Sequence, residues 1–101
     1  MKYIMNVTIY NPEAEENMCS DIFFKLECEF AKEKGSYYGN GYHVSIKGKG
    51  VPFDRLVYDL RYDTDFHAKR KEVWLTNWAH AYWSGQDGAY AVKELTIRKE
   101  A

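Results

Sequence analysis

The sequence predicts an α+β fold in which two amphipathic helices pack on one face of a four-stranded antiparallel sheet. Two observations lead to this prediction. Four short segments alternate apolar and polar residues with a period of two, as half-buried strands do. Two longer segments, residues 12–34 and 64–85, repeat apolar residues at intervals of three or four, as amphipathic helices do.

The length and composition fit one small domain. A chain of 101 residues can bury a core of its own, and we expect a single domain over residues 1–101. The formal charge of −1 argues against a protein that binds polyanions through charge alone. The aromatic fraction of 17% is high for one core, so we expect several tyrosines to reach the surface.

The cysteines and the hydropathy pattern indicate in which cellular compartment the protein is expected. Cys19 and Cys28 form neither a CxxC pair nor a zinc-ligand set, which favours reduced thiols in a cytoplasmic protein. No apolar run approaches about eighteen residues, and the N-terminus lacks a signal-peptide pattern. We therefore expect no membrane span, no secretion and no cofactor.

The first strand is predicted at residues 1–10, with Tyr3, Met5, Val7 and Ile9 on one face. Ile4 and Tyr10 lie on the other face, which indicates that this face is also partly covered.

Residues 11–35 admit two interpretations. Asn11 suits an N-cap, Gly35 can end a helix, and apolar residues recur every four positions at Ala14, Met18, Ile22, Leu26 and Phe30. The same stretch also alternates apolar with charged residues over 24–30, as a strand would. The main prediction is the helix. In the alternative, residues 22–31 form an extra strand and 11–21 a loop, which gives a five-stranded antiparallel sheet with one helix.

The remaining elements follow in order. The stretch 36–41 is predicted as a glycine-rich turn, and 42–47 as a strand that Gly48, Gly50 and Pro52 interrupt. Residues 56–63 and 92–97 are predicted as strands. The helix at 64–85 holds all three tryptophans and ends at Gly85, and its apolar face is predicted to comprise Trp74, Leu75, Trp78, Ala81 and Tyr82.

The order β-α-β-β-α-β is that of the ferredoxin-like arrangement, in which both helices cover one face of the sheet. The other face, with His43, Lys47, Asp59 and Arg61, would then be open to water or to a partner.

An acidic face and a tyrosine loop form the first candidate site. If residues 12–34 are helical, Glu13, Glu16 and Glu27 share one side with Phe24 beside them. An aromatic ring within an acidic face is typical of a protein-binding surface. Tyr37 and Tyr38 in the glycine-rich turn can fill a pocket on the same partner.

A basic cluster forms the second candidate. Lys69, Arg70 and Lys71 lie near the start of the tryptophan helix, where cations oppose the helix dipole and so contribute nothing to local stability. Together with free backbone N–H groups, and with Lys47 and Lys49 from the turn, they could bind nucleic-acid phosphates.

Catalytic and RNA-binding motifs are weak. No metal-ligand spacing, nucleophile elbow or phosphate-binding loop occurs, and Cys28 lies between two glutamates that would raise its thiol pKa. The run from Lys47 to Phe53 resembles the RNP1 motif of the RNA-recognition family over seven residues, but it lacks the aromatics of that motif and contains Pro52. We expect no enzyme and do not carry the RNA-binding function over.

These features favour a non-enzymatic protein-binding module. In size, aromatic content and lack of catalytic motifs, the chain looks like the inhibitors that phages and mobile elements encode against host nucleic-acid machinery, anti-CRISPR proteins among them. The resemblance implies another protein as the partner, such as a nucleic-acid-binding effector. The alternatives are a nucleic-acid-binding accessory protein and a homodimer that pairs through a sheet edge or the open face.

Overall fold

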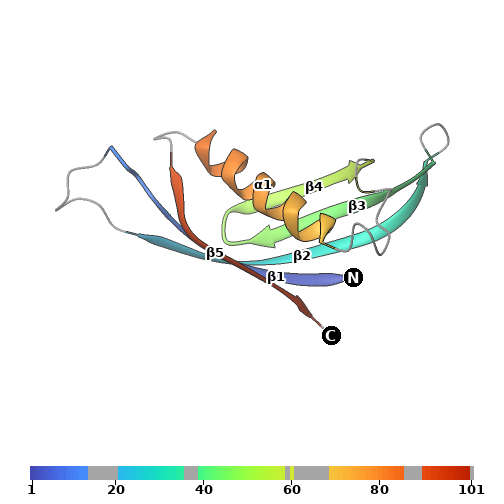
Figure 1. Ribbon diagram of the computed structural model, residues 1–101, viewed down its shortest axis with the longest axis horizontal. Helices are drawn as coiled ribbons and strands as arrows, with labels where there is room; N and C mark the ends of the chain where they lie inside the picture. The colour runs from blue at the N-terminus through green and yellow to red at the C-terminus, as the bar shows by residue number, and fades with distance from the viewer. Residues whose placement is uncertain (14–20, 36–38, 59, 61–68, 86–89, 101) are drawn as a thin grey trace.

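The structure is a two-layer α+β fold with a five-stranded antiparallel sheet and one helix (Figure 1). The computed structural model describes residues 1–13, 21–35, 39–58, 60, 69–85 and 90–100. The strands lie in the order β4-β3-β2-β1-β5. The elements are β1 (Lys2–Tyr10), β2 (Ile22–Gly35), β3 (Gly39–Gly48), β4 (Val51–Val57), α1 (Arg70–Ser84) and β5 (Ala91–Glu100).

The second element is a strand, so the predicted helix was wrong there and the five-stranded alternative is the correct one. Along β2, Leu26, Cys28 and Phe30 are buried while the charged residues between them are exposed. β2 pairs with β1 on one side and β3 on the other, so its central backbone groups find partners in both directions. Asn11 Oδ1 accepts a hydrogen bond from Glu13 N at 3.0 Å, which closes a turn.

The β3–β4 connection is a tight hairpin. β3 ends at Gly48 and β4 begins at Val51, so Gly48 and Pro52 belong to strands, contrary to the predicted break. Gly50 in the turn has φ of 73°, a conformation that favours glycine. Pro52 is tolerated because β4 is an edge strand, whose outward N–H needs no partner.

Two other predicted boundaries also change. The strand predicted at 56–63 was misplaced, because β4 ends at Val57. Leu60 lies beyond that strand in a turn and is fully buried, whereas 59 and 61–63 lie outside the described residues. The predicted turn at 36–41 is part of β3 from Gly39 onward, and 36–38 lie outside the described residues.

Gly48→Ala is expected to lower the free energy of unfolding by about 1–3 kcal/mol. A Cβ at this position would overlap Leu26 Cδ2 and lie 3.0 Å from the Lys25 carbonyl oxygen. Leu26 is fully buried and cannot move aside. The matched control is Gly85→Ala, where the nearest atom is the Ala81 oxygen at 3.4 Å and φ is −87°. That change should be neutral or stabilising. Urea unfolding of both variants measures the difference, and equal losses would contradict it.

The helix packs through a row of residues spaced by four. Lys71, Leu75, Ala79 and Trp83 are buried against the sheet, flanked by the half-buried Trp74, Trp78 and Tyr82. The predicted face was therefore correct in part, but Ala81 is exposed. Gly85 is the C-cap, as predicted, and its N–H donates to the Ala81 carbonyl at 3.2 Å. The predicted helix start at Thr64 lies outside the described residues.

The aromatic residues form a continuous chain of ring contacts between helix and sheet. The ring of Phe30 lies 5.5 Å from that of Tyr3 and 6.4 Å from that of Trp74. The chain continues through Phe53 and Trp78 and ends where Trp83 contacts Phe24. All six described tyrosines are buried or half-buried. Much of the high aromatic content is therefore a structural requirement of the core.

The sheet has one covered and one open face. Figure 1 shows α1 along one face, with β1 and β2 extending beyond the helix at one end and β2 and β3 at the other. The open face carries charged residues, and His43 and Lys47 lie on it as predicted. Ile4 is buried there between Arg98 and Glu27, whose aliphatic stems can cover it. The helix of the described part of the chain is not long and apolar enough to cross a membrane.

Candidate functional site

An apolar groove opens at the C-terminal end of α1. We call it the aromatic groove. It has a volume of about 350 Å³. Its lining comes from the helix end, from neighbouring ends of β1 and β2, from the β3–β4 turn and from the residue before β5. The lining residues are Ile9, Ile22, Phe24, Lys49, Gly50, Val51, Tyr82, Trp83 and Tyr90.

Ring contacts hold the walls of the aromatic groove in place. Trp83 is buried, and its ring lies 5.1 Å from that of Phe24 across the helix–sheet interface. Tyr82 stacks on Trp78 with the ring centres 4.8 Å apart and stands almost perpendicular to Trp83. Side chains fixed in this way lose little further conformational entropy when a ligand binds. The groove is therefore a preorganised apolar site.

Exposed apolar side chains lie next to the aromatic groove. Ile22 is 39% exposed at its rim, and Phe23 is 63% exposed. Since Phe23 and Phe24 are consecutive in a strand, Phe23 points to the open face while Phe24 points into the groove. The start of β2 therefore presents large apolar residues on both faces of the sheet, as protein-binding surfaces often do.

The predicted acidic face does not form as one surface. Phe24 packs on the helix side of β2, whereas Glu27 lies on the open face, because three positions along a strand reverse the side. Glu13 is exposed in the turn after β1. Glu16, Tyr37 and Tyr38 lie outside the described residues. Of the three predicted partner-binding residues that the structure describes, Glu13, Phe24 and Glu27, Phe24 is the one that lines the aromatic groove.

Apart from Lys49, the other groove residues were not selected as site candidates from the sequence, and for Trp83 the reason can be stated. Leu75, Ala79 and Trp83 are spaced by four in the sequence. Lys71 comes four residues before Leu75, and a lysine at that position suggests that this side of the helix is polar and exposed. Lys49, which was predicted to bind phosphate, lies at the rim of the groove. Tyr90 was not selected from the sequence, because it lies before β5 and outside the alternating pattern of that strand.

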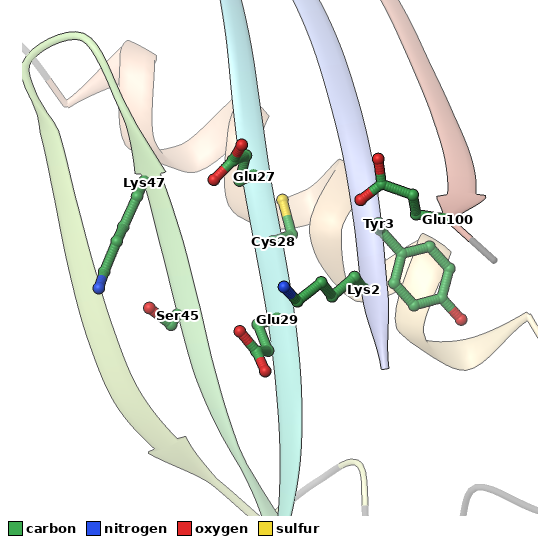
Figure 2. Close-up of a pocket in the computed structure, with 8 residues that line it drawn as sticks. All are labelled: Lys2, Tyr3, Glu27, Cys28, Glu29, Ser45, Lys47 and Glu100. Atoms are coloured by element: carbon green, nitrogen blue, oxygen red, sulfur yellow. The ribbon is translucent and has the colours of Figure 1, made fainter.

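A polar depression on the open face is shown in Figure 2. It has a volume of about 190 Å³. The register places Lys2 directly between Glu29 and Glu100, and Glu27 opposite Lys47. In Figure 2 the side chain of Lys2 extends from β1 across β2 towards Glu29. Opposite charges on neighbouring strands stabilise a solvated sheet face, which is a sufficient explanation for this arrangement.

His43 is held by two carboxylates at another part of the open face. Its Nε2 contacts Asp54 Oδ1, and its Nδ1 lies 3.7 Å from Glu33 Oε1. The three side chains come from β3, β4 and β2, so they link neighbouring strands. Among the described residues no group of three or more histidines, cysteines or carboxylates has the arrangement of a metal site.

The predicted basic cluster is divided between surface and core. Lys69 is the N-cap of α1 and Arg70 its first residue, and both are exposed. Lys71 is buried, with Nζ 4.3 Å from the centre of the Tyr42 ring. Burial lowers the pKa of Lys71, with smaller contributions from Lys99 and Lys32. Lys71 therefore does not share the exposed surface on which Lys69 and Arg70 lie.

The exposed basic residues that were predicted to bind nucleic acid are far apart. Lys49 lines the aromatic groove beside Trp83, whereas Lys69 and Arg70 stand at the helix N-terminus. A helix of 15 residues separates these ends by about 22 Å. Lys47 lies on the open face of β3. The basic residues of the nucleic-acid hypothesis thus do not gather into one patch.

Within the described ranges, two groups on the covered side have a raised pKa. Burial raises the pKa of the Cys28 thiol to about 12. The sequence predicted this direction from Glu27 and Glu29, but those side chains point to the opposite face, so the cause is burial. The pKa of Tyr3 is also raised, first by burial and then by Glu72 and Tyr42. A thiol that stays protonated is a poor nucleophile.

Comparison of the chain with models of protein families, with curated proteins and with solved structures found no match. Function is therefore inferred from the aromatic groove and the surfaces around it.

Proposed function

We propose that the protein is a non-enzymatic protein-binding module whose aromatic groove receives a large apolar side chain of its partner. The observation that carries this proposal is the groove itself, a preorganised apolar recess of about 350 Å³ between the end of α1 and the sheet. Binding hot spots are typically apolar or aromatic anchors that insert into such recesses.

The rim of the aromatic groove indicates the chemistry of the partner segment. Lys49 stands at the rim and is exposed, so its ammonium group favours a carboxylate next to the inserted side chain. Ile22, which is partly exposed at the rim, extends the apolar area beyond the groove. The expected ligand is a peptide segment with an aromatic or aliphatic anchor followed or preceded by Asp or Glu.

The biological role that we attach to this binding is inhibition. In size and composition the chain looks like the small inhibitors that phages and mobile elements encode, anti-CRISPR proteins among them. The proposed target is a protein component of a host complex that handles nucleic acid. Direct nucleic-acid binding remains the alternative prediction, and a steep log-linear loss of affinity with salt would identify it.

Selection from a random peptide library displayed on phage tests the proposal. Immobilised protein should enrich peptides with one large apolar residue beside an acidic residue. Lys49→Glu should remove the acidic preference or replace it with a basic one, because the charge at the rim is reversed. The matched control is Lys69→Glu, which makes the same charge change at the far end of α1.

Two outcomes would overturn the groove as the binding site. One is the absence of any enriched motif. The other is an identical motif selected by the wild type and by Tyr90→Ser, which removes one wall of the groove. A gel shift with duplex and single-stranded DNA at low salt, performed on the same preparation, tests the nucleic-acid alternative.

A further inference from the structure

We propose that the protein forms a symmetric dimer in which β5 pairs antiparallel with β5 of a second copy, about a two-fold axis through Thr96. β5 is an edge strand of the sheet, with β1 on one side. Its ten residues contain neither proline nor glycine, the residues that weaken strand pairing. The other edge strand, β4, carries Pro52, Asp54 and Arg55 and is poorly suited to add a strand.

The symmetry restricts the possible registers. In an antiparallel dimer, the two-fold axis is perpendicular to the sheet, so the open faces of both copies become continuous. Each residue then opposes a residue on the same face of the second copy. Along β5, Glu94 and Arg98 lie on the open face opposite Thr8 and Ile4, whereas Leu95 and Ile97 lie on the covered face.

An axis through Thr96 makes β5 complementary to itself. Glu94 then opposes Arg98 of the second copy, and the symmetry creates this pair twice. On the covered face Leu95 opposes Ile97 of the second copy, so the half-buried edges of both side chains are removed from water. Within the described part of the chain, neither Glu94 nor Arg98 forms an ion pair.

The neighbouring registers lack this complementarity. An axis through Ile97 would oppose Glu94 to Glu100 and Leu95 to Lys99. An axis through Arg98 or Glu94 would place two like charges directly opposite each other, which is destabilising. An axis through Leu95 would oppose Glu94 to Thr96 and leave Arg98 beyond the regular segment of the second copy, with no opposite charge across from it. The register shift after Thr8, where β5 bulges at Lys93, limits regular pairing to the segment from Glu94 onward.

Mass measurement and charge exchange test the dimer. Light scattering or sedimentation between about 5 and 500 µM should show the mass rising from 11.9 kDa towards twice that value. Glu94→Arg or Arg98→Glu alone should weaken association by about tenfold, because both symmetric pairs become repulsive. The double exchange Glu94→Arg/Arg98→Glu restores opposite charges and should recover wild-type association. It also controls for misfolding, since it contains both substitutions.

Disulfide trapping tests the register. In a Cys19→Ser background, Thr96→Cys should form a covalent dimer, because directly opposed residues in an antiparallel pair have Cα atoms about 4.5–5.5 Å apart. Arg98→Cys alone should not, since residue 98 is about four residues, or 13 Å, away from its own copy. A mixture of Glu94→Cys and Arg98→Cys should cross-link.

Two results would overturn the proposal. One is a protein that stays monomeric at the highest concentration, and the other is a dimer whose association is unchanged by Glu94→Arg and by Arg98→Glu. Neither Glu94 nor Arg98 lines the aromatic groove, so failure here leaves the peptide selection unaffected.

Discussion

Trp83→Ala is expected to lower the free energy of unfolding by about 3–5 kcal/mol, a large part of the stability of a domain of this size. The side chain is 3% exposed, and its ring contacts those of Phe24, Trp78 and Tyr82. Its removal leaves a cavity where the end of α1 contacts β2 through Phe24. Chemical denaturation followed by circular dichroism gives the loss directly.

The control for this experiment lies on the same helix. Val73 is 54% exposed, so Val73→Ala should change the stability by less than about 0.5 kcal/mol. Similar losses in the two variants would show that Trp83 does not anchor the helix. The aromatic groove would then lose the rigid wall on which its preorganisation depends.

The second large effect is a loss of stability at alkaline pH that depends on Cys28. Burial raises the thiol pKa from 9.0 to about 12. Between these values the unfolded chain releases the proton while the folded protein keeps it, so the folded state binds more protons and its stability falls as pH rises. A shift of about three pH units corresponds to a loss of about 4 kcal/mol by pH 12.

Cys28→Ala isolates this contribution. At pH 7 the variant should be less stable than the wild type by about 1–2 kcal/mol, because a buried sulfur atom is removed. Above pH 9 its stability should fall less steeply, so the two curves converge and then cross. The raised pKa of Tyr3 and the lowered pKa of Lys71 are common to both proteins, so their effects cancel in the comparison. Urea midpoints measured from pH 7 to 11.5 provide the curves. If the stability of the two proteins fell with pH at the same rate, the raised pKa of the Cys28 thiol would be contradicted.

The aromatic groove shows how far sequence analysis reaches towards a site. Phe24 and Lys49 were both selected as candidates, but for two different surfaces and two different ligands. Their proximity depends on the pairing of β2 with β1 and β3 and on the tight turn at Gly50, which places the β3–β4 hairpin beside Trp83. No local pattern contains this information, because the contacts join residues that are distant in the sequence.

The α+β class, the first strand, the strand after residue 42, the last strand and the tryptophan helix are properties of the sequence alone, since each segment has one clear periodicity. Residues 22–35 are different, because their apolar residues satisfy the helical and the extended period together. Only the tertiary structure decides between them. As a central strand this segment supplies hydrogen-bond partners to both neighbouring strands. It also buries Leu26, Cys28 and Phe30 under α1. A helix over the same residues would leave the edges of the neighbouring strands without these partners.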